Sequence, residues 1–184
     1  MLLGGGGCTR DRERSAAEPP KPRSTRHLTF TNSEYAVLSS AVERLIPRDE
    51  DPGAIDAGVP VYIDRMLTTP ELSPMRDDLI AGLNALERRS RGELEKGFAE
   101  ATPAEQDALL REFKDADPST GEARFFELLT ALAMEGFLGD PSYGGNKERV
   151  GWALMGFGTS EPMDGYNGVK HLHNLRCEGS HECR

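Results

Sequence analysis

The side chains best suited to metal chemistry gather in the last fourteen residues, HLHNLRCEGSHECR. His171, His173, Cys177, His181 and Cys183 offer imidazole and thiolate groups, which are ligands that zinc favours. Their spacing matches no standard zinc finger. Three interpretations stay open: a metal site, a disulfide bond between Cys177 and Cys183, and a tail with free thiols. Because the spacing does not decide between them, no metal ligand is assigned.

A second cluster is acidic and lies in the loop PRDEDPGAIDAGVP. Asp49, Asp51 and Asp56 are candidates for calcium binding or for acid–base chemistry. The loop lacks the alternating carboxylates, the central glycine and the closing glutamate of an EF-hand. We therefore expect a solvated acidic loop, and an independent enzyme that uses Asp51 or Asp56 is the weaker alternative.

Other kinds of reaction centre lack their sequence motifs. No serine stands in a G-x-S-x-G elbow, and no C-x-x-C-H sequence is present for covalent haem. The glycines follow no strand and lack the spacing of a dinucleotide fingerprint. The sequence therefore predicts no catalytic residue and no cofactor-binding residue in this chain.

The charge of the chain is unevenly distributed. The formal net charge is −9, yet residues 1–26 hold six of the 22 basic and three of the 31 acidic residues. Residues 27–184 thus carry a net charge of −12, which phosphate backbones repel, so nucleic acid is not expected as a partner. No apolar run approaches the roughly 18 residues of a transmembrane helix, so no direct membrane span is expected.

The N-terminal residues read as a leader. The start MLLGGGG is shorter than the apolar region of a signal peptide, which needs about 7 to 15 residues. Prolines and charges dominate the positions that follow and leave little to bury. Residues 1–27 are therefore expected to be a disordered leader or the remnant of a signal peptide whose true start lies upstream. Cys8 is left over when Cys177 and Cys183 are paired.

The rest of the sequence is patterned for helices. Thr31 with Glu34, and Thr102 with Glu105, have the spacing of capping boxes, and apolar residues then recur three and four positions apart. Alternating strand patterns are nearly absent. We expect an all-α fold, a single compact domain of about five or six helices over residues 28–158. An irregular tail with Cys and His follows at 159–184. The expected helices cover about 31–46, 60–67, 73–86, 102–113 and 121–134.

One stretch near the end of this domain, EGFLGDPSYGGNKERVGWALMGFG, is rich in glycine and aromatic residues. Asp140-Pro141 ends a helix, because the residue before proline avoids helical dihedrals. Gly144 and Gly145 permit positive φ, which predicts a sharp reversal that presents Tyr143 and Asn146. Apolar residues follow, and they serve either as an interface or as a cap on the helical bundle: Val150, Trp152, Leu154 and Phe157.

This stretch closely resembles the signature of the gluconate 2-dehydrogenase subunit 3 family. The upstream segment LTFTNSEYAVLSSAVERLIPRDEDPGAIDAGVPVYID also looks like the start of that family, so the resemblance covers about residues 28–158. The residues that carry the signature are Glu135, Gly136, Asp140, Pro141, Tyr143, Gly144, Gly145, Asn146, Gly151, Trp152, Gly156 and Phe157.

The resemblance implies a non-catalytic small subunit of a periplasmic dehydrogenase that is membrane-associated through its partners. Its partner would be a large subunit of the glucose-methanol-choline type, which holds FAD and oxidises the substrate, and a multihaem cytochrome c subunit would pass electrons onward. Small subunits of this family support folding of the flavoprotein and typically carry a twin-arginine export signal. In this chain, no Arg-Arg pair precedes an apolar stretch.

The signature stretch is also where we expect the partner interface, with Trp152→Ala or Gly145→Val weakening the complex more than the isolated fold. The expected interface residues are Glu135, Phe137, Asp140, Tyr143, Gly144, Gly145, Asn146, Trp152 and Phe157.

Overall fold

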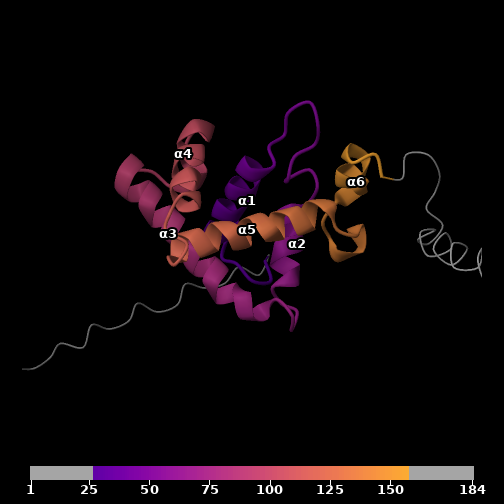
Figure 1. Cartoon of the computed structure of the whole chain (residues 1–184), viewed down its shortest axis with the longest axis horizontal. Helices are drawn as coiled ribbons and strands as arrows, with labels where there is room; N and C mark the ends of the chain where they lie inside the picture. Colours follow the sequence, from indigo (N-terminus) through magenta and orange to yellow (C-terminus); the bar gives the residue numbers. More distant parts are fainter. Residues whose placement is uncertain (1–26, 158–184) are drawn as a thin grey trace, which may run out of the picture.

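Six α-helices build the part of the chain that the computed structural model describes, residues 27–157 (Figure 1). No strand occurs in this range, so the predicted all-α fold is confirmed. The leader before His27, the Cys177–Cys183 pair, Cys8 and the tail lie outside the described residues. The helices are α1 (Asn32–Leu45), α2 (Val59–Met66), α3 (Arg76–Leu94), α4 (Pro103–Lys114), α5 (Gly121–Leu138) and α6 (Val150–Leu154).

Both predicted capping boxes are present. The Thr31 hydroxyl accepts a hydrogen bond from the Glu34 backbone N–H at 3.2 Å, and the Glu34 carboxylate accepts one from the Thr31 backbone N–H at 2.8 Å. Thr102 and Glu105 repeat this exchange at the start of α4. Each box satisfies backbone donors that a helix start otherwise leaves without partners, which is why these two helices begin where the sequence places them.

The central element is α5, which runs across the middle of the molecule and packs against α2, α3 and α4 (Figure 1). A close helix crossing forms where Gly82 of α3 lies against Phe125, since a Cβ at Gly82 would stand 2.0 Å from the Phe125 ring. The largest core side chains come from loops and helices alike: Phe30, Phe98, Phe113, Leu38, Ile63, Leu67, Leu79, Leu83, Leu86, Leu129 and Leu132.

Two helices are longer than predicted. α5 ends at Leu138 rather than near Met134, and Pro141 then starts a 3-10 turn, so the Asp140-Pro141 stop is confirmed. The extra turn forms because Gly136 and Phe137 continue the buried stripe of α5. α3 likewise continues to Leu94. Its last two turns hold few apolar residues, so the apolar periodicity of the sequence does not predict them.

The first described residues are fastened to α2. The Asp64 carboxylate, which is 7% exposed, accepts hydrogen bonds from the backbone N–H groups of Leu28 and Thr29 at 2.9 and 2.8 Å. The Thr29 hydroxyl donates in turn to the Asp64 carbonyl oxygen at 2.9 Å. A buried charge on α2 thereby fixes the point at which the helical domain begins.

Candidate docking surface at the C-terminal end of α5

Asn146 is the centre of the signature stretch, and it is fully buried. Its backbone N–H donates to the Gly136 carbonyl oxygen at 2.7 Å, and its side-chain Nδ2 donates to the Gly139 carbonyl oxygen at 2.9 Å. The amide oxygen Oδ1 accepts from the Gly151 N–H at 2.9 Å. One residue therefore joins the end of α5, the following loop and the start of α6.

Trp152 completes the same arrangement. Its indole Nε1–H donates to the Leu138 carbonyl oxygen at 2.7 Å. The last carbonyls of a helix have no partner within the helix. Here the carbonyls of Gly136, Leu138 and Gly139 receive donors from Asn146 and Trp152, so the signature stretch closes the C-terminal end of α5.

Two glycines permit this closure by letting backbones approach. A Cβ at Gly145 would stand 2.1 Å from the Gly136 carbonyl oxygen, and a Cβ at Gly151 would stand 2.0 Å from that of Phe137. The predicted reversal is present at Gly144, which has φ of +100° and follows an exposed Tyr143. Gly145 has no positive φ and is needed for its size instead.

Three of the predicted interface residues are buried in this structure. Phe137, Gly145 and Asn146 lie inside the domain, so in this structure they build the frame behind a surface rather than the surface. The reversal does not present Asn146, because its side-chain amide finds two backbone partners inward and its backbone N–H finds a third. The other six predicted residues are exposed or half-buried: Glu135, Asp140, Tyr143, Gly144, Trp152 and Phe157.

The closing loop is also fastened to α2 and the loop before it. The Lys147 N–H donates to the Ala57 carbonyl oxygen at 2.9 Å. The Tyr62 hydroxyl donates to the Glu135 carboxylate at 3.1 Å, while the Tyr62 ring lies against Gly136. Burial, and then the neighbouring Glu135 charge, raise the pKa of Tyr62 to about 12.

The backbone between Asn146 and α6 is strained. Asn146, Glu148 and Arg149 have φ of +42°, +58° and +60°. Asparagine tolerates this left-handed region, whereas glutamate and arginine disfavour it by roughly 1 to 2 kcal/mol each. Such conformations persist only where the surrounding contacts hold them, and they cluster at functional sites.

Exposed apolar side chains concentrate beside this loop. Six of the nine large apolar side chains that are exposed in residues 27–157 belong to segments 55–61 and 143–157. Trp152 packs edge-on against Phe157, with ring centroids 5.5 Å apart, and Phe157 remains 48% exposed. The six are Ile55, Val61, Tyr143, Leu154, Met155 and Phe157.

A hollow of about 500 Å³ lies within this apolar region. One wall comes from the loop after α1 and from α2, and the other comes from the loop before α6. The exposed apolar residues that line it, Ile55 and Val61, were not predicted from the sequence. Val61 could have been found, because it stands on the face of α2 away from buried Tyr62 and Ile63, whereas Ile55 lies in a loop without periodicity. The lining residues are Arg48, Pro52, Ile55, Asp56, Gly58, Val61, Lys147, Glu148 and Val150.

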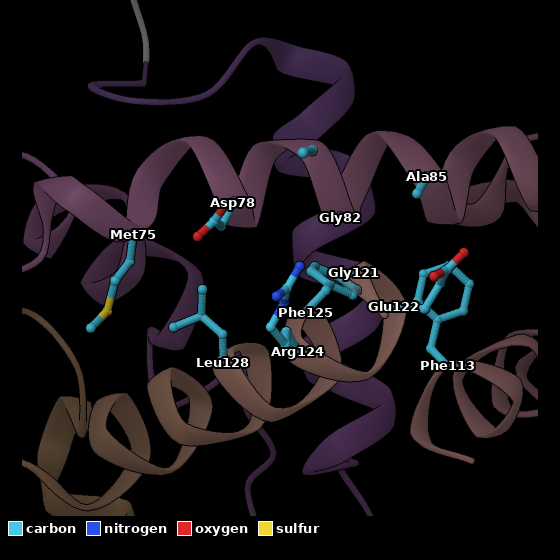
Figure 2. Close-up of a pocket in the computed structure, with 11 residues that line it drawn as sticks. Met75, Asp78, Gly82, Ala85, Phe113, Gly121, Glu122, Arg124, Phe125 and Leu128 are labelled. Carbon is cyan, nitrogen blue, oxygen red and sulfur yellow. The ribbon is translucent and has the colours of Figure 1, made fainter. Parts of the chain in front are cut away.

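A second groove, of about 490 Å³, runs between α3 and α5 (Figure 2). Met75 and Leu128 lie at one end of it, and Phe113 at the other (Figure 2). Phe113 and Phe125 are 1% and 2% exposed, whereas Met75 is 41% exposed. It shares no lining residue with the hollow beside α6.

The acidic loop forms internal contacts. Asp56 accepts hydrogen bonds from Arg48 at 3.1 Å and from the Gly53 N–H at 3.1 Å, and Asp49 accepts one from the Asp51 N–H at 2.9 Å. Within residues 27–157, no group of three or more His, Cys, Asp or Glu residues is placed to hold a metal ion. The His/Cys cluster of the sequence lies beyond this range.

Taken together, the described residues form a small all-α domain with a rigid cap at one helix end and an apolar surface beside it. The family model of gluconate 2-dehydrogenase subunit 3 matches residues 32–158, and the chain belongs to this family. By its family it is a subunit of a dehydrogenase complex. No curated protein and no solved structure matches the chain. In the range 27–157, none of the helices has the length and apolar character needed to cross a membrane.

Proposed function

We propose that this chain is the non-catalytic small subunit that binds and stabilises the FAD-carrying subunit of a periplasmic sugar or gluconate-type dehydrogenase. The partner is a flavoprotein of the glucose-methanol-choline type, which oxidises a CH–OH group. A multihaem cytochrome c subunit accepts the electrons, and the complex reaches the membrane through these partners. The small subunit also assists export of the flavoprotein.

The observation that carries this proposal is the apolar surface beside α6. Leu154 is the last residue of the five-residue helix α6, and Met155 and Phe157 follow it; the three side chains are 44%, 70% and 48% exposed. Contiguous exposed apolar surface on a soluble domain marks an interaction site. The buried frame around Asn146 holds these side chains in place before any partner arrives, which reduces the entropy lost on binding.

Co-purification tests the proposal. The chain, with an affinity tag, is co-expressed with a flavoprotein of the glucose-methanol-choline type from the same organism, and absorption spectra are recorded for the chain alone and for the eluted material. We expect a yellow eluate that reduces an artificial electron acceptor in the presence of substrate, and a colourless chain when it is expressed alone. A tagged chain that never retains the flavoprotein would contradict the proposal.

A further inference from the structure

We infer that residues 19–26 of the leader, PPKPRSTR, dock back into the groove between α3 and α5. In this arrangement the prolines lie along the apolar lining, and the basic side chains pair with Asp78 and Glu122. This docking is independent of the proposed function, because the groove shares no lining residue with the hollow beside α6.

The groove is lined by apolar side chains that are open to solvent. Ala81 and Ala85 supply the α3 wall, and Met75 and Leu128 lie together at one end (Figure 2). Met75 and Ala81 are exposed, and Ala85 and Leu128 are half-buried. The volume of about 490 Å³ falls within the range of roughly 300 to 1,000 Å³ that is typical of binding sites. The space suits a short extended segment with small apolar rings.

The charges of the groove favour a cationic occupant. Asp78 lies near one end and Glu122 near the other, with Arg124 between them (Figure 2). None of the three forms an ion pair among the described residues, so two carboxylates stand against one guanidinium. Residues 27–157 as a whole contain 13 basic and 24 acidic residues, a net charge of −11. A second copy of this acidic domain is therefore repelled from the groove.

Residues 19–26 carry the opposite charge. Lys21, Arg23 and Arg26 are basic, and none of the eight residues is acidic. Three of the eight are proline, which favours polyproline II, a preformed extended helix that binds apolar grooves at a low cost in entropy. Residues 158–184 hold three basic and four acidic residues, so charge favours the leader over the tail as the occupant.

The leader joins the described fold beside α3. His27 stacks on the ring of Tyr35, with centroids 3.8 Å apart. The adjacent residue, Glu34, accepts a hydrogen bond from the Asn84 side chain of α3 at 3.2 Å. The start of α1 thus holds the end of the leader near the middle of α3. Such a tether gives the leader an effective concentration on the order of millimolar at the groove.

The leader is long enough to reach the groove. Ala85 lies about 100° around α3 from Asn84, which is an arc of about 10 Å on a helix of this width. Residues 24–26 span about 10 Å when extended and can cover that arc. Residues 19–23 span about 15 Å as polyproline II. That length exceeds the rise of about 10 Å along α3 between Asp78 and Ala85.

The first arm of the test is limited trypsin digestion of the full chain. Arg14 and Arg23 are each followed by serine, so two bonds of the same type can be compared within the leader. Mass spectrometry gives both initial rates, and a free peptide of residues 8–27 provides the reference rate for each bond. Docking covers Arg23 and leaves Arg14 outside the groove. We expect the normalised rate at Arg23 to be at least fivefold lower than that at Arg14.

The second arm removes charges in matched variants. Asp78→Asn combined with Glu122→Gln neutralises the groove carboxylates, and the control Glu50→Gln combined with Asp51→Asn neutralises two exposed carboxylates of the acidic loop. We expect the two normalised rates to agree within twofold in the groove variant and the fivefold difference to persist in the control. Arg124→Gln removes the groove cation and is expected to increase the protection. Circular dichroism confirms that the helices of each variant are intact.

The third arm is carbodiimide coupling, which joins an amine to a carboxylate only where the two are in contact. We expect Lys21 to be joined to Asp78 or Glu122, and Lys170 of the tail to be joined to neither. A mixture of ¹⁵N-labelled and unlabelled chains separates links within one copy from links between copies.

Three outcomes would overturn the docking. Equal normalised rates at Arg14 and Arg23 in the unmodified chain mean that the leader is not held. Protection that survives in the groove variant means that the leader is held elsewhere. Links that form only between labelled and unlabelled chains mean that the occupant is the leader of a second copy. Each result leaves the proposed function standing, because binding of the flavoprotein is measured separately by co-purification.

Discussion

Replacing Asn146 tests whether the signature stretch acts as a structural frame. In Asn146→Ala, the buried Gly151 N–H and the Gly139 carbonyl lose their side-chain partners. A buried donor without a partner costs about 1 to 3 kcal/mol, and the second hydrogen bond contributes about 1 kcal/mol. Alanine at a φ of +42° adds about 1 kcal/mol. The expected loss in free energy of unfolding is therefore about 3 to 5 kcal/mol.

Trp152 provides the assay, because it is the only tryptophan of the chain and donates to the Leu138 carbonyl. Its fluorescence during urea unfolding reports on α6, whereas far-UV circular dichroism reports on the whole helical domain. With a denaturant dependence of about 2 kcal/mol per molar urea, the fluorescence midpoint is expected to fall by roughly 1.5 to 2.5 M. The midpoint from circular dichroism falls less if the end of α5 opens first.

Two further variants sharpen the interpretation. Asn146→Gly removes the same side-chain hydrogen bonds but relieves the backbone, so it is expected to be more stable than Asn146→Ala by about 1 kcal/mol. Asn84→Ala is the control, since half-buried Asn84 bonds to Glu34 and to its own helix, and its loss is expected to cost about 1 kcal/mol or less. A fluorescence midpoint for Asn146→Ala within about 0.3 M of the unmodified chain would refute the reasoning.

Two other predictions concern the same end of the molecule. Gly145→Ala is expected to lower the free energy of unfolding by about 2 kcal/mol or more, because its Cβ would stand 2.1 Å from the Gly136 carbonyl oxygen. Gly92→Ala in α3 is expected to raise the free energy of unfolding by about 0.5 to 1 kcal/mol in the same urea experiment, because a Cβ there meets no neighbouring group within 4 Å. The pKa of Tyr62 is raised to about 12 in the fold, so its contribution to stability is complete below the unfolded-state value of 10.0 and is lost as pH rises through about 12. Unfolding curves between these pH values are expected to show this loss for the unmodified chain and a smaller one for Tyr62→Phe; equal pH dependence would contradict the assignment.

Helix starts could be predicted because their causes are local. Thr31 with Glu34, and Thr102 with Glu105, exchange hydrogen bonds over three positions, so spacing alone predicts the capping boxes. The end of α5 was harder to place, because Gly136 stays helical only where it packs against Tyr62, which comes from another helix. Contacts of that kind leave no periodic signal in the sequence.

The function of the signature stretch could be predicted only in part. Glycine and aromatic residues indicated a reversal and an apolar surface, and both are present at Gly144 and Phe157. The direction in which Asn146 points depends on the end of α5, seven and ten residues earlier at Gly139 and Gly136. A polar residue at a turn is ordinarily exposed to solvent. Asn146 is buried instead, because two backbone carbonyls and one backbone N–H replace water as its hydrogen-bond partners.

Residues that follow α5 in the chain complete its C-terminal end, so this end of the helix can form fully only after those residues have been synthesised. A ribosome releases α5 before residues 145–152, so the last turn of that helix emerges with its carbonyls still hydrated. Only when Trp152 has left the ribosome can that turn be completed and held against α2. A nascent chain that stalls within this interval therefore carries a frayed helix end, and the apolar surface takes shape as one of the final steps of translation of the domain.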